Sequence, residues 1–420
     1  MRRFIWHLQV GILMGGGLAH GVLAQTTLTW QQVKDKFEAD NPNVRAGQLN
    51  IQESKAEEIT AYLRPNPNLT AGLDQLQPFN GNPYRPFAYA FPLVAFDYLH
   101  ERQRKRELRL ESAQKGTSIA ESQQLDLERT LLFTLRSAFI QTLQAKALQA
   151  SAKENLDYFD KELSISRVRF KSGDIARVDL DRLVLQRAQY ESDYQTALVN
   201  ARTARITLLM LLNDRTPVDR FDVTGPFEFE ERIMALDEFH SAALAARPDL
   251  KAAIETVDKA ETDHKLAVSN GSTDPTFGVD LGRNPPITIY IGFSINIPLR
   301  IFDRNQGEKA RTEIDIAHAQ RQKDAAEAQV FSDVDSAYFT VVSSVNLLLP
   351  YKGTDGYLET ATRIRDAMSF AYQRGQAALL DYLDAQRDYR ATQVAYINLV
   401  GSYLSAASQL NTAVGREVIK

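Results

Sequence analysis

The residues best placed to do chemistry are two carboxylates in the last tenth of the sequence. Asp381 and Asp384 stand three residues apart, so on a helix both side chains point to the same side. Carboxylates gathered in a confined space attract cations. The pattern therefore predicts a cation-attracting site if another element or another copy of the chain brings more acids beside them. Two aspartates at this spacing are also typical of a solvated helix surface, and that alternative stays open.

Other kinds of chemistry have little support in the sequence. The chain has no cysteine, which excludes disulfides, thiolate metal sites and CxxC redox chemistry. No HxxxH, HExxH or phosphate-binding P-loop pattern appears outside the first 25 residues. The formal net charge of −4 does not indicate a nucleic-acid partner. We therefore predict a protein that is not an enzyme and that holds no cofactor and no resident metal ion.

The N-terminus predicts an exported protein. Arg2 and Arg3 precede a short apolar, glycine-rich run that ends in Val22-Leu23-Ala24, and this order is typical of a secretory signal peptide spanning residues 1–24. After it, no run of about 18 apolar residues occurs, which is roughly what a membrane-spanning helix needs. Any contact of the mature chain with a membrane must therefore be made by strands.

One segment has the pattern of such a strand. From Ile287 to Ile297 the odd positions are Ile or Phe, while the even positions are Thr, Tyr, Gly, Ser and Asn. This period of two indicates a strand with one apolar face. It fits a strand packed on a soluble core, and it also fits a membrane-crossing barrel strand, which needs about 9–11 residues.

An internal repeat organises the rest of the chain. The segments AYAFPLVAFD, NPNLTAGLD and FKSGDIARVDL of the first half correspond to SINIPLRIFD, DPTFGVDLG and YQRGQAALLDY of the second half. Each copy reads as helix, two strands, long helix, tight turn and helix. We predict repeats at 25–225 and 226–420, strands at about 66–77, 84–94, 274–283 and 286–298, and turns near Gly173 and Gly375.

The helices are predicted to be long. No proline lies between Pro92 and Pro217, so a helix from about residue 97 to 170 would extend on the order of 110 Å. A seven-residue rhythm predicts a coiled-coil seam, and its positions in the first copy are Leu183, Tyr190, Tyr194, Ala197, Ala201, Ala204, Leu208 and Leu211. A plain coiled-coil stalk would account for this seam but not for the strands. Pro350 predicts an interruption of the second long helix.

The number of strands indicates how a barrel could close. Two strands in each copy make four per chain, which cannot close a barrel alone, whereas three chains would supply twelve. In such a barrel Ser294 and Asn296 would face the lumen. The residues predicted to face lipid are Phe87, Tyr89, Phe91, Ile289, Ile291, Phe293 and Ile295.

The two-copy layout, the strand pairs that end in FPL and IPL, and the segment YQRGQAALLDYLDAQRDY resemble the TolC-like outer-membrane efflux proteins. The third segment carries the family's tip turn, a glycine followed by an Asp-x-x-Asp pair, as Gly375, Asp381 and Asp384. The resemblance implies a mainly α fold with membrane strands. It implies a homotrimer that forms a 12-stranded barrel in the lipid of the Gram-negative outer membrane and a coiled-coil helical barrel across the periplasm. A periplasmic adaptor and an inner-membrane pump would be the partners.

The same resemblance assigns roles to particular residues. Threefold symmetry would turn Asp381 and Asp384 into two stacked carboxylate rings at a periplasmic gate, with Asp179 as the partial match in the first copy, where Arg182 replaces the second acid. The family's arginine after the second tip glycine is absent, because Ala377 stands there. The residues expected to dock the adaptor are Lys171, Ser172, Gly173, Asp174, Arg374, Gly375 and Gln376.

Two functions are therefore weighed. The first is a passive exit duct that receives cargo from an adaptor and a pump. The second is a periplasmic coiled-coil adaptor or scaffold without a channel, which would have no need of alternating apolar strands at matched places in two repeats. The basic run HERQRKRELR at 100–109 begins a long helix next to the strands. It could meet lipid headgroups, although such runs are also typical of a solvated helix face.

Overall fold

The computed structural model describes residues 26–76, 78–79, 83–87, 89–231, 234–284 and 287–419. The predicted signal peptide, residues 1–24, lies outside these ranges. The first half of the chain contains β1 (Thr26–Leu28), α1 (Trp30–Asp40), α2 (Pro42–Tyr62), β2 (Asn68–Asp74), β3 (Phe91–Leu99), α3 (Lys105–Lys171) and α4 (Arg177–Leu211). A connecting region follows with η1 (Val218–Arg220), β4 (Phe221–Val223) and α5 (Leu236–Ala246).

The second half repeats the order of elements seen in the first. It contains α6 (Pro248–Asn270), β5 (Thr276–Asn284), β6 (Ile287–Asn296), α7 (Gln306–Leu348), η2 (Leu349–Tyr351), α8 (Tyr357–Gln373) and α9 (Leu379–Val414). Most of the described residues are helical, as predicted. Helix, two strands, long helix, turn and helix therefore occur twice in the described chain.

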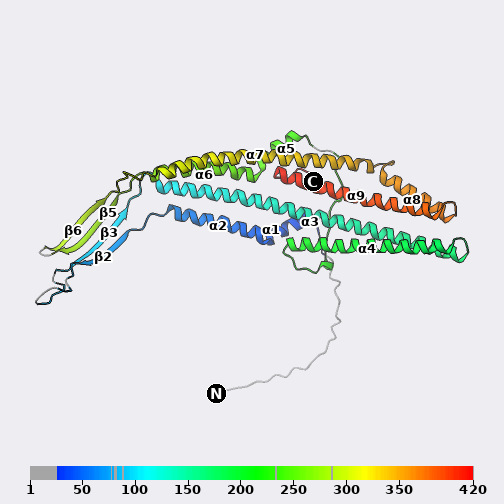
Figure 1. The fold of residues 1–420 in the computed structure, drawn as a ribbon, viewed down its shortest axis with the longest axis horizontal. Helices are drawn as coiled ribbons and strands as arrows, with labels where there is room; N and C mark the ends of the chain where they lie inside the picture. Colours follow the sequence, from blue (N-terminus) through cyan, green and yellow to red (C-terminus); the bar gives the residue numbers. More distant parts are fainter. Residues whose placement is uncertain are drawn as a thin grey trace, which may run out of the picture.

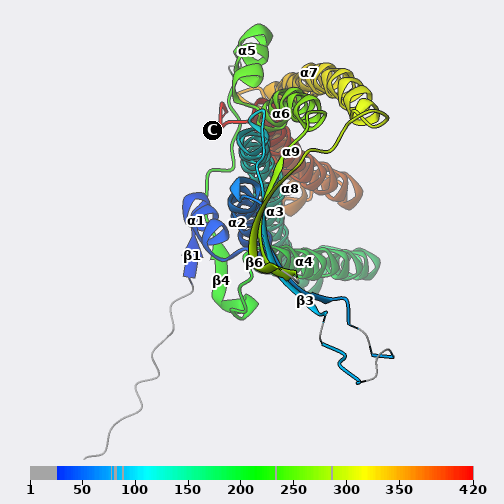
Figure 2. The same cartoon turned by 90° about the vertical axis from the view of Figure 1, so that its left-hand side faces the viewer.

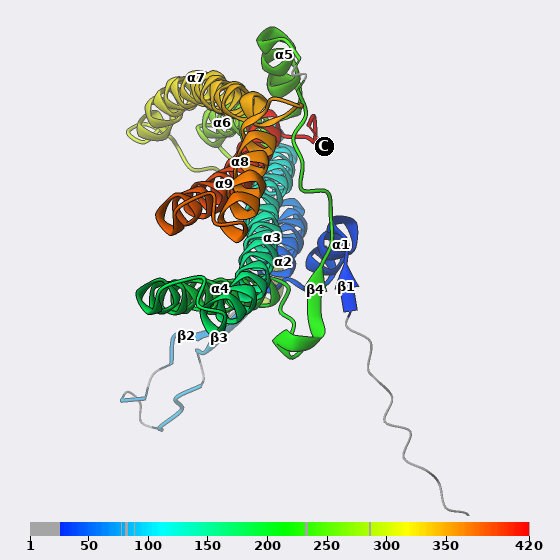
Figure 3. The same ribbon diagram turned by 90° about the vertical axis from the view of Figure 1, so that its right-hand side faces the viewer.

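The molecule is an elongated rod with the sheet and the hairpin turns at opposite ends. Figure 1 shows β2, β3, β5 and β6 at one end and the α3–α4 and α8–α9 turns at the other. Viewed from the sheet end (Figure 2) and from the hairpin end (Figure 3), α1, β1, β4 and α5 lie outside the bundle of long helices. β1 and β4 pair in parallel, which joins the start of the described chain to residues 221–223.

The 67 residues of α3 would extend about 100 Å at helical rise. The helix begins later than predicted, at Lys105, because β3 continues to Leu99 and because Gln103 and Arg104 have positive φ. The second long helix is interrupted where Pro350 predicts it. α7 ends at Leu348, and α8 begins only at Tyr357. Within the described part of the chain, no helix combines the length and the apolar character needed to cross a membrane.

The predicted seam faces the interior. Leu183, Tyr190 and Leu208 are buried in α4, and the equivalent face of α9 buries Ala385 and Leu410. The aromatic members stack at the hairpin end, where the Phe159 and Tyr190 rings lie 4.7 Å apart. Side chains along one stripe of α4 and one stripe of α9 therefore pack in the interior of the bundle.

A buried arginine ties the middle of the bundle together. Arg247, between α5 and α6, is almost fully buried and donates from Nη1 to Asp333 Oδ2 on α7 at 2.7 Å and to the carbonyl oxygen of Ala413 on α9 at 3.3 Å. A second carboxylate, Asp249, lies 2.5 Å from Arg247 Nη2. Two carboxylates and a carbonyl thus balance the buried charge, so the network fixes α6, α7 and α9 relative to one another.

Candidate functional sites: a sheet face and the hairpin tips

The first candidate site is one face of the four-stranded sheet. The strands pair in the order β2-β3-β5-β6, all antiparallel, and residues paired across strands share a face. One row of paired residues across the sheet is Leu69, Phe96, Val279 and Phe293, and the next row is Ala71, Val94, Leu281 and Ile291. Phe293 is 83% exposed and Ile291 is 63% exposed. This chain alone therefore presents a continuous apolar face to its surroundings.

The opposite face of the same sheet is polar. Asp97, Asp280, Tyr290 and Ser294 occupy the alternate positions of β3, β5 and β6. Glycines give these side chains room to lie along the sheet, since a Cβ on Gly292 would lie 2.5 Å from Asp280 Oδ1. A face of this kind suits contact with water and solutes.

The structure corrects three of the predicted lipid-facing residues. Ile289, Ile291, Phe293 and Ile295 are exposed at the odd positions of β6, the phase of the apolar face. Phe87 and Tyr89 lie outside the strand, in a segment of turns that precedes β3. Pro83 and Pro86 in this segment have no backbone N–H to donate to a neighbouring strand.

Phe91 belongs to β3 but lies on the polar face. Its ring stacks on Tyr290 at 5.9 Å, and the apolar phase of β3 belongs to Val94 and Phe96. Residues two apart in a strand share a face, so Phe91 lies on the side of Asp97. The assignment of Phe91 to the apolar face is therefore wrong.

The second candidate site is the pair of hairpin tips. Gly173 and Gly375 have φ of +84° and +71°, in the left-handed region that favours glycine, and both stand in turns as predicted. Each turn satisfies the last helix carbonyls in the same way. Asp174 N–H donates to Arg169 O at 2.9 Å, and Gln376 N–H donates to Ala371 O at 2.8 Å. Both tips are thus compact turns in which glycine is the residue of low strain.

The tips also contact one another. Arg169 Nη1 donates to the carbonyl oxygen of Tyr372 at 2.8 Å, and its guanidinium lies over the Tyr372 ring at 5.1 Å from the centroid. The remaining predicted docking residues, Lys171, Ser172, Arg374 and Gln376, are exposed around the two turns. The α3–α4 and α8–α9 hairpins therefore present their turns at the same end of the rod (Figure 3).

The predicted gate residues stand just after these turns. Asp179 and Asp381 are the third residues of α4 and α9, and so occupy equivalent positions in the two hairpins. Asp381 is exposed, whereas Asp384 pairs with Arg387 Nη1 at 3.2 Å. Asp381 and Asp384 both lie on one helix, α9, as predicted.

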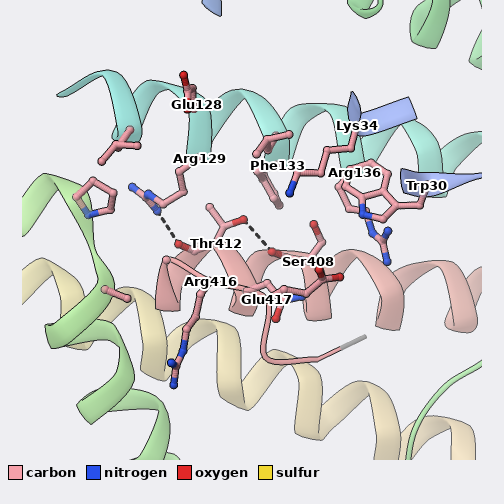
Figure 4. Close-up of a pocket in the computed structure, with 16 residues that line it drawn as sticks. Trp30, Lys34, Glu128, Arg129, Phe133, Arg136, Ser408, Thr412, Arg416 and Glu417 are labelled. Carbon is pink, nitrogen blue, oxygen red and sulfur yellow. Dashed lines mark hydrogen bonds between the residues drawn. The ribbon is translucent and has the colours of Figure 1, made fainter. Parts of the chain in front are cut away.

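A cavity of about 410 Å³ lies beside α3 (Figure 4), and no pattern in the sequence indicated it. Trp30, Arg129, Arg136 and Thr412 line it, and Arg129 Nη1 donates to Thr412 O at 2.6 Å. The Arg136 guanidinium lies 4.4 Å from the Trp30 ring centroid, and burial lowers the pKa of Arg136. The residues come from three distant segments, so no local spacing could have predicted this cavity.

Comparison with known proteins shows what the chain is similar to. Residues 240–416 match the family model described as "Outer membrane efflux protein". The second half of the chain is therefore similar to this family. One relative of the chain is the cobalt-zinc-cadmium resistance protein CzcC of Cupriavidus metallidurans, which is 23% identical over 334 residues that cover 74% of each chain. The outer membrane efflux protein BepC of Brucella suis is 22% identical over 301 residues, 69% of this chain and 64% of BepC.

The solved structures show that the fold is shared. The crystal structure of CusC superimposes with a TM-score of 0.77 over 92% of each chain, at 16% sequence identity. At this identity the likeness concerns the arrangement of helices and strands. The chain therefore has the same fold as this solved structure.

One buried acid stands out in the hairpin bundle. Glu162 on α3 is 6% exposed, and its Oε1 accepts from Gln373 Nε2 at 2.7 Å and from Ser369 Oγ at 3.2 Å, both on α8. Its Oε2 has no hydrogen-bond partner among the described residues. Burial raises the pKa of Glu162 above its ordinary value of 4.5, and the two donors only partly oppose this.

We expect Glu162→Gln to stabilise the folded protein by about 1 kcal/mol at pH values above the raised pKa. A raised folded pKa gives stability that is complete below the ordinary value and is lost as pH rises through the folded value. The variant should therefore lose less stability between acidic and neutral pH. Melting temperatures of the detergent-purified protein at several pH values test this. Glu191→Gln, at an exposed ion pair with Arg187, is the control and should change little.

Proposed function

We propose that the protein is the outer-membrane exit duct of a tripartite efflux system, which passively conducts cargo delivered by an inner-membrane pump and a periplasmic adaptor. The observation that carries the proposal is the sheet, whose exposed face is apolar across all four strands while its other face is polar. β5 and β6 have 9 and 10 residues, within the range of about 9–11 for a membrane-crossing strand. The match of residues 240–416 to the model of outer membrane efflux proteins supports the same function.

The edges of the sheet support assembly into a closed barrel. β2 and β6 are the two outer strands, and each pairs on one side only within the described chain. Unpaired strand edges are not tolerated in lipid. Because the four strands alternate in direction, β6 of one copy can pair antiparallel with β2 of the next. Three copies would close a barrel of twelve strands, with the apolar face toward lipid and the polar face toward the lumen.

The helices would then form the periplasmic part of the duct. In this proposal 25–225 and 226–420 are the two structural repeats, and the helical rods of three copies surround one tunnel. The exposed turns from Lys171 to Asp174 and from Arg374 to Gln376 are the proposed adaptor-docking tips, six in a trimer. Asp381, Asp384 and Asp179 would lie near the tunnel axis as the periplasmic gate.

The proposal is tested by extracting the full-length protein from bacterial membranes and imaging the purified particle. We expect extraction to require detergent and the particle to be a threefold-symmetric rod on the order of 140 Å long. A protein that is released by buffer alone as a monomer would contradict the proposal. That result would favour the second function, a periplasmic adaptor or scaffold.

A further prediction concerns the proposed gate. Replacing both Asp381 and Asp384 with Ala should lower the cation selectivity of the channel several-fold, because six carboxylates in a confined space create a strong negative potential. Reversal potentials of the purified trimer in a planar bilayer under a salt gradient measure this. Asp388→Ala is the matched control, since Asp388 lies on the same helix and is 73% exposed. Unchanged selectivity in the double variant would mean that these aspartates are ordinary surface residues.

The equivalent aspartate of the first hairpin should contribute less. Asp179→Ala removes one acid from a position where Arg182 stands in place of a second one. We expect a smaller loss of cation selectivity than in the double variant, measured in the same recordings. An equal or larger loss would place the main constriction at the α3–α4 hairpins.

A further inference from the structure

A small pocket lies where the sheet meets the helices, at the start of α3. Its volume is about 200 Å³, and its lining includes Arg64, Tyr98, His100, Glu101, Lys105 and Arg106. Arg64 comes from the link between α2 and β2, Tyr98 from the end of β3, and Lys105 and Arg106 from the first turn of α3. The pocket therefore gathers charged residues from three segments at one level of the rod.

The charges in and around this pocket leave an excess of positive charge. Glu107 pairs with Arg106 Nη2 at 3.3 Å, and Glu101 pairs with Arg109 Nη1 at 2.5 Å. Arg64 is exposed, and it takes part in none of the ion pairs found among the described residues. Its Nη1 donates instead to the Tyr98 hydroxyl at 3.5 Å. The local acids are thus neutralised, and a guanidinium stays available at the pocket mouth.

Two further basic residues strengthen this excess. Arg102 and Arg104, in the turn before α3, are exposed, and neither joins an ion pair among the described residues. Lys105 is buried and is held by Asp274 Oδ2 at 2.5 Å. An anion that enters the pocket would therefore meet the exposed guanidinium of Arg64, with Arg102 and Arg104 in the adjoining turn, and the lining carboxylates Glu101 and Glu107 are already paired.

The pocket begins where the apolar face of the sheet ends. Tyr98 pairs with Phe277, which pairs with Ile295, and this row is the row of the apolar face nearest the helices. The His100 ring packs edge-on against Phe277, with the centroids 6.4 Å apart. Tyrosine at the border of an apolar band, with arginine beyond it, is the arrangement found at membrane–water interfaces. The apolar face and the basic pocket are thus continuous, and one ligand could cover both.

We propose that this pocket binds the phosphate of an anionic phospholipid in the membrane leaflet on the helix side. Arg64 would hold the phosphate beside Arg106, and the acyl chains would lie along the apolar face from Phe277 toward Leu281, away from the helices. The proposal rests on the proposed function, because it requires the sheet to stand in a bilayer. A free phosphate would meet the same guanidinium groups, but only a lipid also covers the apolar rows beside them. Basic pockets of this kind bind acidic headgroups, and each Lys or Arg raises the affinity about fivefold.

The test is native mass spectrometry of the full-length, detergent-purified protein titrated with phosphatidylglycerol and, separately, with zwitterionic phosphatidylcholine. We expect preferential binding of phosphatidylglycerol, weakened about fivefold by Arg64→Gln and largely retained by Arg64→Lys. A double variant, Arg64→Gln with Arg106→Gln, should bind still more weakly. Arg321→Gln is the control, because Arg321 is 85% exposed on α7 and lies about 20 Å along that helix from its start.

Equal phosphatidylglycerol binding by the Arg64→Gln and Arg321→Gln variants would overturn the site, whereas the trimer and its insertion would stand. Full displacement of the lipid by glycerophosphate would identify a free-phosphate site and overturn the assignment to lipid. A protein that leaves the membrane without detergent would overturn the proposed function and this inference together. If the Arg64→Gln variant loses the preference for phosphatidylglycerol over phosphatidylcholine, the Arg321→Gln variant keeps it, and the trimer content of both is unchanged, the inference is supported.

Discussion

Replacing Ile291 with Lys is expected to keep the protein from assembling in the outer membrane. Ile291 is exposed in the middle of β6, paired with Leu281, in a row that continues through Val94 to Ala71. In the proposed barrel this row faces lipid, and a lysine near the midplane costs roughly 2–4 kcal/mol. Membrane fractionation, followed by detection of the trimer, measures the outcome. We expect the variant to be depleted from the outer-membrane fraction.

The matched control is Ser294→Lys on the same strand. Ser294 lies on the opposite face, where a Cβ added to Gly278 would come within 2.3 Å of Ser294 Oγ and 2.6 Å of Asp97 Oδ1. Ser294 and Asp97 therefore lie close together, and a lysine at 294 gains a carboxylate neighbour. This variant should assemble normally. Equal assembly of the two variants would contradict the barrel assignment, and equal failure of both would mean that the strand tolerates no lysine on either face.

The strands show how far the sequence could predict the fold. β6 alternates between Ile or Phe and polar residues, so its apolar face was readable without a structure. The apolar face of β3 could not be predicted in the same way. The internal repeat aligns Pro92 with Pro298, but the two prolines stand at different places relative to β3 and β6. Pro298 follows the end of β6, whereas Pro92 is the second residue of β3, where β3 pairs with β2 only. The repeat aligned the two segments, but the strand boundaries differ between them. The strand predicted at 84–94 is therefore found at 91–99, and Phe91 was assigned to the opposite face of the sheet.

The hairpin tips were predictable because the signal is local. A glycine that must adopt positive φ ends a helix wherever it stands, and Gly173 and Gly375 do so with the same pair of backbone hydrogen bonds. The pocket at the start of α3 was not predictable, because Arg64 and Tyr98 meet only through the packing of α2 and β3 on α3. The basic run at 100–109 was visible in the sequence, but its pairing with Glu101, Glu107 and Asp274 was not.

Replacing Gly375 with Trp is expected to abolish efflux while leaving trimers in the outer membrane. A Cβ at this position has open space around it, since among the described residues only Arg169 Nη2 comes within 4 Å of it, at 3.9 Å. The positive φ adds strain of about 1–2 kcal/mol in one turn, which a bundle of this size can tolerate. The indole would therefore extend outward from the tip, over the surface proposed to dock the adaptor.

Two controls separate docking from backbone strain. Gly375→Ala imposes the same φ restriction without the bulk, and it should keep most of the efflux. Gly353→Trp places the same bulk at a glycine with φ of +92° and open space around it, but in the loop between η2 and α8. It should leave efflux intact. Efflux in cells that depend on this protein, together with capture of the adaptor by the purified trimer, provides the measurement. If Gly375→Trp exports normally and still captures the adaptor, the docking surface does not include the second hairpin turn, and the exposed turn at Gly173 becomes the next position to change.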